Sequence, residues 1–154
     1  MKKKISFVLT SVMLILSMAF PVSAAEITTT EEGTVIDEMV TASNYFNGST
    51  GTMNSWYGAD SAAWPISSPS MSVGNPAVTK VTVTVTKKSS SDNFYIFVES
   101  PEGTIEYKPV TGSGSYYFYT EFDNEDPEGT WYVWIKSYGG IATATARLRV
   151  DYTY

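Results

Sequence analysis

The amino-acid sequence predicts an all-β protein, an antiparallel β-sandwich preceded by a signal peptide, and three observations support that class. Residues 79–86 alternate, with Val81, Val83 and Val85 on one face, which is the period-two pattern of a half-buried strand. Aromatic runs such as 115–122 have the composition of strands, because aromatic rings suit a pleated surface. No stretch after the signal peptide shows a convincing helical period.

The first 25 residues have the three parts of a secretory signal peptide. Lys2–Lys4 form its basic region, residues 5–20 are mostly apolar, and small residues precede the expected cleavage after Ala25. The alternative is a retained membrane anchor, but the apolar run is short of the about 20 residues that span a bilayer. We therefore expect a secreted, extracellular protein with no membrane span in the mature chain.

Charge and composition exclude several functions. Without the three signal-peptide lysines, 7 Lys and Arg remain against 16 Asp and Glu, a net charge of −9. Nucleic acids and anionic lipids need a basic patch, so neither is an expected partner. The chain has no cysteine and no histidine. This excludes disulfides, thiol chemistry, a lipid-anchored lipoprotein, His-dependent triads and nearly all zinc sites.

The first part of the mature chain is polar and rich in turn signals. Residues 26–43 form an acidic leader, in which residues 35–40 fit either an edge strand or a short helical turn. Residues 44–76 are rich in Gly, Ser, Asn and Pro, and a structureless loop of that length is unusual in a domain. We therefore expect short strands here, in a single sandwich domain over 44–154. The expected aromatic anchors of this segment against the sheet are Trp56, Tyr57 and Trp64.

Two Pro-Glu-Gly-Thr segments punctuate the second part of the chain, at 100–104 and 126–130. Each has Ser or Asp, then Pro, then Gly at the spacing of a type I turn. In the strand that follows the second segment, Trp131 and Trp134 lie on opposite faces, since three is odd in a period of two. Trp131 is the predicted core residue. After residues 79–86, further strands are expected at 93–99, 105–110, 115–122, 130–137 and 142–154.

The order of these pieces resembles the P domain, or homo B domain, that follows the catalytic domain in subtilisin-like proprotein convertases and bacterial relatives. The matching parts are the alternating strand 81–85, the strand and Ser-Pro-Glu-Gly-Thr of 93–104, and Pro-Glu-Gly-Thr-Trp-Tyr-Val-Trp-Ile at 127–135. The resemblance covers about residues 77–154. Bacterial pre-peptidase C-terminal domains are similar more loosely, through the same Gly-Thr-Trp-Tyr-Val strand. Both imply a jelly-roll-like sandwich that accompanies a peptidase, here absent from the chain.

An aromatic face is the first candidate site. If Phe94, Ile96 and Val98 of one strand and Trp131, Val133 and Ile135 of another point into the core, the residues between them point outward. An exposed apolar patch of that size marks an interaction site for a protein or a cell-surface glycan. The alternative is that residues 44–66 fold over this face. The predicted ligand-binding residues are Tyr95, Phe97, Tyr117, Tyr119, Tyr132 and Trp134.

An acidic cluster is the second candidate site. Closely spaced oxygen ligands in a loop suit Ca²⁺, which takes carboxylate and carbonyl oxygens in flexible geometry. Glu99 and Glu102 join the cluster if the two Pro-Glu-Gly-Thr segments meet at one end of the sandwich. The alternative is a solvated acidic loop, and the resembling family often has Asp where Asn93 and Ser137 stand. The predicted calcium ligands are Asp92, Asp123, Asn124, Glu125 and Asp126.

Catalysis is not expected. Carboxylate pairs such as Glu99 with Glu121 suit glycosidic acid–base work, but pairs of this kind arise by chance among 16 acidic residues. We expect a secreted binding or accessory protein that requires no cofactor and resembles a stand-alone P domain. The alternative is a structural or self-assembling extracellular or envelope protein, a homo-oligomer built on the same face.

Overall fold

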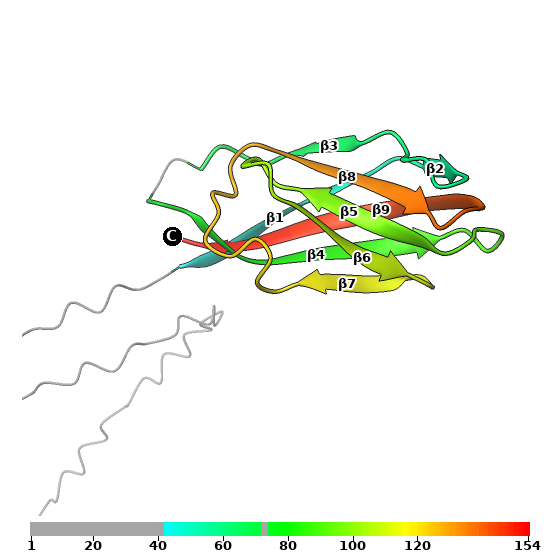
Figure 1. The fold of residues 1–154 in the computed structure, drawn as a ribbon. Helices are drawn as coiled ribbons and strands as arrows, with labels where there is room; N and C mark the ends of the chain where they lie inside the picture. Colours follow the sequence, from blue (N-terminus) through cyan, green and yellow to red (C-terminus); the bar gives the residue numbers. More distant parts are fainter. Residues whose placement is uncertain (1–41, 72–73) are drawn as a thin grey trace, which may run out of the picture. The chain divides into compact units, whose positions relative to one another are not determined.

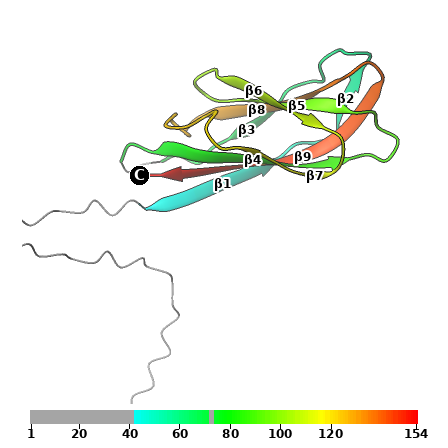
Figure 2. The same cartoon turned by 60° about the horizontal axis from the view of Figure 1, so that its bottom comes forward.

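Two antiparallel sheets packed face to face make up the fold (Figures 1 and 2). The structure is a computed structural model that describes residues 42–71 and 74–154, and this part of the chain contains no helix. The predicted all-β sandwich is confirmed. The signal peptide and residues 35–40 lie outside the described residues.

Sheet A contains β1 (Ser43–Ser49), β2 (Met53–Trp56), β4 (Ala77–Lys87), β7 (Gly114–Phe118) and β9 (Ile141–Thr153). Sheet B contains β3 (Trp64–Ser67), β5 (Phe94–Glu99), β6 (Ile105–Val110) and β8 (Thr130–Ser137).

The strand order is that of a jelly roll. Sheet A runs β1-β9-β4-β7, with β2 also on β9, and sheet B runs β3-β8-β5-β6. β1 and β2 together act as one interrupted strand that pairs with β9. Moving inward along the chain from both ends, β3 pairs with β8, β4 with β7, and β5 with β6 in the central hairpin. A long hairpin rolled up in this way gives a jelly roll, in agreement with the predicted fold class.

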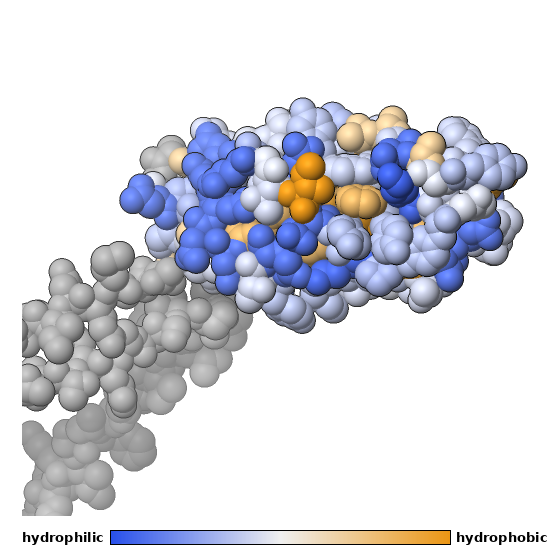
Figure 3. Space-filling model, viewed as in Figure 1, coloured by the Kyte–Doolittle hydropathy of each residue, from blue (hydrophilic) through white to orange (hydrophobic). Residues whose placement is uncertain are grey.

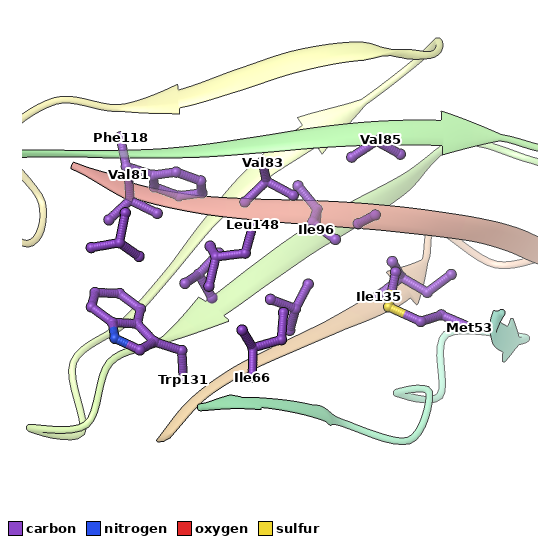
Figure 4. Close-up of a cluster of buried hydrophobic side chains, with 14 of the residues drawn as sticks. Met53, Ile66, Val81, Val83, Val85, Ile96, Phe118, Trp131, Ile135 and Leu148 are labelled. Carbon is purple, nitrogen blue, oxygen red and sulfur yellow. The ribbon is translucent and has the colours of Figure 1, made fainter. Parts of the chain in front are cut away.

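The core lies between the sheets and follows from the alternation of the long strands. Val81, Val83 and Val85 of β4 are buried, and β9 places Leu148 opposite Val83. From sheet B, the inward residues of β5 and β8 are fully buried, Trp131 among them, as predicted. Figure 4 shows these apolar side chains from both sheets filling the space between the layers.

Only the first Pro-Glu-Gly-Thr segment forms the predicted turn. The N–H of Gly103 donates to the carbonyl of Ser100 at 3.0 Å. The N–H of Gly129 donates instead to Ser68 Oγ at 2.8 Å, so the second prediction is wrong. Pro127 is buried, and its carbonyl accepts a 3.0 Å hydrogen bond from the Trp131 indole N–H. This second segment is fixed by tertiary contacts, which local turn chemistry does not reveal.

The segment 44–76 contains the expected short strands, but two of its three expected anchors are wrong. Trp56 and Tyr57 are 54% and 78% exposed, because the chain turns at the end of β2 and points both rings away from the sheets. Trp64 does pack against the core, where its indole covers Gly51 so closely that a side chain there would overlap the ring.

The strand expected at 115–122 is also shorter than predicted. β7 ends at Phe118, and the chain turns over the next four residues. The turn returns Phe122 to the core, with its ring centroid 5.4 Å from that of Trp131. The predicted strand was too long because the aromatic composition of residues 115–122 continues past the end of β7.

Candidate binding face

The outer surface of sheet B carries a continuous group of aromatic side chains, the aromatic face, which comprises Tyr95, Phe97, Tyr107, Tyr132, Trp134 and Tyr138. Strand alternation produces it. Because Trp131, Val133 and Ile135 of β8 are buried, Tyr132 and Trp134 between them point outward. The same alternation sends Tyr95 and Phe97 of β5 outward, and Tyr107 of β6 with them.

Phe97 is the centre of this face. The strand register places it opposite Trp134 of β8 on one side and Tyr107 of β6 on the other. Its ring is stacked on Trp134, with centroids 5.1 Å apart and planes within 8°. On the other side, the centroid of Tyr107 lies 5.3 Å away. Phe97 therefore has an aromatic neighbour on each adjacent strand.

A second group of rings continues the face. Tyr95 lies 5.3 Å from Tyr107 in an edge-to-face arrangement and 4.5 Å from Tyr138, which follows the end of β8. Burial, followed by the neighbouring hydroxyl of Tyr95, raises the pKa of Tyr138 above its ordinary value. The Tyr138 hydroxyl therefore keeps its proton at neutral pH.

Charged residues lie at the margins of the face. Lys136 pairs with Asp60 at 3.5 Å, and Glu99 stands opposite Tyr132. Figure 3, seen from the side of sheet B, shows apolar colour in the middle of the surface and hydrophilic residues toward the end of the acidic loop. The centre of the face is thus free of charged groups, as the centre of a docking surface usually is.

Four of the six predicted ligand-binding residues come together on this face: Tyr95, Phe97, Tyr132 and Trp134. The other two, Tyr117 and Tyr119, do not, because β7 pairs with β4 in sheet A and not with β8. Their rings stack on one another at 5.6 Å on the opposite side of the molecule.

Sequence reasoning missed Tyr107 and Tyr138. The signal for Tyr107 is present in the alternation of residues 105–110, where Ile105, Tyr107 and Pro109 share one side. Nothing local marks Tyr138, which lies just beyond the end of β8. Its place beside Tyr95 depends on the pairing of Phe94 with Ser137.

The segment 44–66 does not fold over the aromatic face. β1 and β2 pair with β9 in sheet A, and β3 extends sheet B along β8. The outward residue of β3, Pro65, stands next to Tyr132 and enlarges the face. Within residues 42–71 and 74–154, no segment covers the aromatic face.

The acidic cluster divides between the two ends of the sandwich. Asp92 lies at the start of β5, where it accepts a 2.9 Å hydrogen bond from the Ile141 N–H, whereas Asp123–Asp126 lie near the other end of that strand (Figure 1). The placement of Asp92 with the loop was therefore wrong, because a strand of six residues separates them. Glu102 does join the loop, since it accepts a 2.7 Å bond from the Asp126 N–H.

The loop does not offer a complete set of calcium ligands as it stands. Asp126 Oδ1 accepts the N–H of Glu128 at 2.9 Å, while Glu125 Oε2 is buried with no hydrogen-bond partner among the described residues. In the part of the chain that the structure describes, no three acidic residues come close enough to hold a metal ion. Of the candidate catalytic carboxylates, Glu121 is engaged in an ion pair with Lys108.

Comparisons with known proteins leave the family of this chain open. No protein-family model matches it, and no curated protein matches it. Among solved structures, a crystal structure of FLHE is similar over 73% of this chain and 96% of that chain, with 17% identity and a TM-score of 0.47. A likeness at this level carries no argument about the present protein. Between residues 42 and 154, leaving aside 72–73, no helix is long and apolar enough to cross a membrane.

Proposed function

We propose that this protein is a secreted, non-catalytic binding module, similar to a stand-alone P domain, that docks a protein partner through the aromatic face. The observation that carries the proposal is the arrangement around Phe97, where rings from β5, β6 and β8 hold one another in place. Rings fixed before binding lose little conformational entropy on docking, and Tyr and Trp are enriched at interfaces for this reason.

The packing of the rings favours a protein over a glycan. A sugar stacks on the free face of an aromatic ring, but Phe97 is stacked on Trp134 and has Tyr107 5.3 Å away on the next strand. The centre of the surface is therefore a cluster of rings packed against one another. Around it, tyrosine hydroxyls supply hydrogen bonds, with Tyr107 53% and Tyr132 37% exposed. A cluster of packed rings surrounded by hydroxyl groups is complementary to a mixed apolar and polar protein surface.

The size of the face indicates a transient complex. Four strands about 4.8 Å apart, with three outward positions each about 6.8 Å apart, give a footprint of about 20 Å by 20 Å, roughly 400 Å². A standard stable interface buries about 800 Å² on each partner. A homodimer through this face alone would be weak for the same reason. We therefore propose a separate extracellular protein as the partner, and a secreted peptidase is the first to test because P domains accompany peptidases.

Binding to cells of the producing organism and to its secreted peptidases tests the proposal. The labelled chain from Glu26 onward is compared with Trp134→Ala, and with Tyr117→Ala as a matched control on sheet A. We expect binding that is lost in Trp134→Ala and kept in Tyr117→Ala, and that protease treatment of the cells removes while periodate oxidation of glycans does not. Binding that survives Trp134→Ala, or that periodate abolishes, would contradict the proposal, as would an absence of binding to both targets.

Calcium remains a separate proposal for the loop 123–126 with Glu102. The reason is Glu125 Oε2, which is buried in this acidic loop without a hydrogen-bond partner among the described residues. A cation bound only by the folded chain raises its melting temperature. Equal melting temperatures in millimolar calcium and in chelator would remove calcium from the proposal and leave the aromatic face unaffected.

A further inference from the structure

The edges of the two sheets are protected unequally. An edge strand presents unpaired N–H and C=O groups, and proteins block such edges with proline, charge or short strands. Sheet B has a proline in each edge strand, Pro65 in β3 and Pro109 in β6. In sheet A, β7 has five residues, and Lys108 lies over its last ring, Phe118, at 5.1 Å. The fourth edge is β1, continued by the four residues of β2.

β1 is the least protected of the four edges. Its seven residues pair with β9 in an unbroken register, from Ser43 with Thr153 to Ser49 with Arg147. The strand Ser-Asn-Tyr-Phe-Asn-Gly-Ser contains no proline and no charged residue of its own, although Arg147 and Arg149 of β9 contact the side chains of Asn47 and Tyr45. Figure 2 shows it as the outermost strand of its layer.

The hydrogen bonds show which backbone groups of β1 face outward. The N–H groups of Ala42 and Thr50, at even positions, donate to carbonyls of β9 and Tyr154 at its end, at 3.2 and 2.8 Å. Alternation along the strand then directs the N–H and C=O groups of the odd positions away from β9. The N–H of Tyr45 is consistent with this, since it donates to its neighbour's Asn44 Oδ1 at 2.8 Å. The residues whose backbone N–H and C=O groups point away from β9 are Ser43, Tyr45, Asn47 and Ser49.

We propose that β1 pairs antiparallel with β1 of a second copy of this chain across a two-fold axis, so that the two A sheets become one continuous sheet. Only an extended polypeptide supplies donors and acceptors with the strand repeat, which excludes a glycan at this edge. An antiparallel strand is complementary to itself about a two-fold axis. Two copies with a net charge of −9 repel one another, and β1 adds no further negative charge, since the charged groups that reach its side chains are the guanidinium groups of Arg147 and Arg149.

The proposal does not depend on the aromatic face, because β1 belongs to the other sheet. It is tested by sedimentation equilibrium on the chain from Glu26 onward, at concentrations from micromolar to millimolar. Tyr45→Pro removes an N–H that β9 does not use, while Tyr45→Ala removes the ring and keeps that N–H. We expect reversible dimers for the parent chain and for Tyr45→Ala, and at least tenfold weaker association for Tyr45→Pro.

A second variant and a second measurement guard against misfolding of the proline variant. Ser49→Lys places a charge on the same edge without touching the backbone, and it should also weaken association at least tenfold, with an unchanged melting temperature. In the parent chain, hydrogen exchange at the Tyr45 and Asn47 amides should slow as concentration rises.

Three outcomes would overturn the proposal. The first is a parent chain that stays monomeric at millimolar concentration. The second is a dimer that Tyr45→Pro and Ser49→Lys leave intact while Trp134→Ala disrupts it, which would place the contact on the aromatic face. The third is protection of the Asn47 amide at all concentrations in a monomer, which would show that another part of the same chain occupies the edge.

Discussion

The outer faces of the two sheets are built by the same strand alternation and yet carry different chemistry. On sheet A the outward positions are mostly threonine, serine, asparagine and arginine, with Thr84 opposite Arg147 and Thr82 opposite Arg149. On sheet B the equivalent positions carry the aromatic face. One solvated, polar face is the normal outcome for an antiparallel sheet. Sheet A follows that rule, whereas the outer surface of sheet B is aromatic. We therefore expect the function to lie on the aromatic face of sheet B.

The few aromatic residues on the face of sheet A sharpen the contrast. The Tyr45 ring is covered by the Arg149 guanidinium, 3.8 Å from the ring centroid. That guanidinium also donates to Asp151 Oδ1 at 2.6 and 2.9 Å, which holds the pKa of Arg149 above its ordinary value. On sheet A the Tyr45 ring is therefore capped by charge, and Tyr117 contacts only Tyr119, whereas the rings around Phe97 on sheet B form one larger cluster.

The largest expected effect separates the two sides of β8 itself. Trp131→Ala removes a fully buried ring and its hydrogen bond to the Pro127 carbonyl, and should lower the free energy of unfolding by about 3–5 kcal/mol. Trp134→Ala, three residues on, removes a partly exposed ring and should cost about 1–2 kcal/mol. Urea unfolding of both variants measures the difference. Equal losses would mean that sheet B is packed on both sides and that its outer face is a second core.

The next effect compares the centres of the two outer faces. Phe97→Ala removes ring contacts to Trp134 and Tyr107, and should destabilise the fold by about 2 kcal/mol. Thr84→Ala on sheet A removes an exposed hydroxyl that contacts Ser115 Oγ at 3.0 Å, and should change stability by less than about 0.5 kcal/mol. Phe97→Ala should also abolish partner binding, which Thr84→Ala leaves intact. A neutral Phe97→Ala would show that the rings are not held by one another.

The contrast between the faces was only half predictable from the sequence. Alternation is local, so the inward and outward sides of β4, β5 and β8 could be assigned from residue order alone. The sheet to which a strand belongs depends on pairing between distant residues. For this reason Tyr117 was assigned to the wrong face, and Tyr138, which reaches Tyr95 only through the β5–β8 pairing, was missed.

Loop contacts were less predictable still. Asp92 and Asp126 are both aspartates with acidic or polar neighbours in the sequence. In the structure the Asp92 carboxylate accepts the N–H of Ile141 at one end of the sandwich, whereas the N–H of Asp126 donates to the Glu102 carboxylate at the other. Gly129 follows the turn pattern that Gly103 obeys, but a distant hydroxyl, that of Ser68, takes its N–H. Residue spacing cannot reveal such partners, because they come from other strands.

A smaller effect tests whether charge stabilises sheet A as ring packing stabilises sheet B. Arg149→Met keeps an unbranched apolar stem in place of the alkyl part of arginine and removes both the guanidinium contact with Tyr45 and the pair with Asp151. Because the Arg149 side chain is 46% exposed, the loss should be only about 0.5–1 kcal/mol. Addition of 1 M salt should reduce the stability of the parent and leave Arg149→Met nearly unchanged. A salt-independent difference between the two would attribute the effect to packing of the alkyl chain.

The smallest effect concerns the ion pair between Lys108 of β6 and Glu121, which follows β7 and so links the two sheets. Burial tends to raise the pKa of Glu121, but the hydrogen bond from Lys108 and two backbone N–H groups outweigh it, and the net pKa is lowered. A lowered pKa in the folded chain gives stability that is present above the ordinary pKa of 4.5 and is lost as the pH falls through the folded value. With Lys108 about a third exposed, the contribution should stay below about 1 kcal/mol.

Lys108→Met tests this link through the pH dependence of unfolding. The parent should lose slightly more stability than Lys108→Met between about pH 5 and pH 3, and the two should differ least at the acid end, where Glu121 is protonated in both. Lys108→Met leaves every ring of the aromatic face in place, so partner binding at neutral pH should not change. Parallel pH profiles would mean that the jelly-roll core and its hydrogen bonds join the two sheets without help from charge. In that case the ion pair would play no part in joining the two sheets, and the two outer faces would differ only in the side chains that they carry.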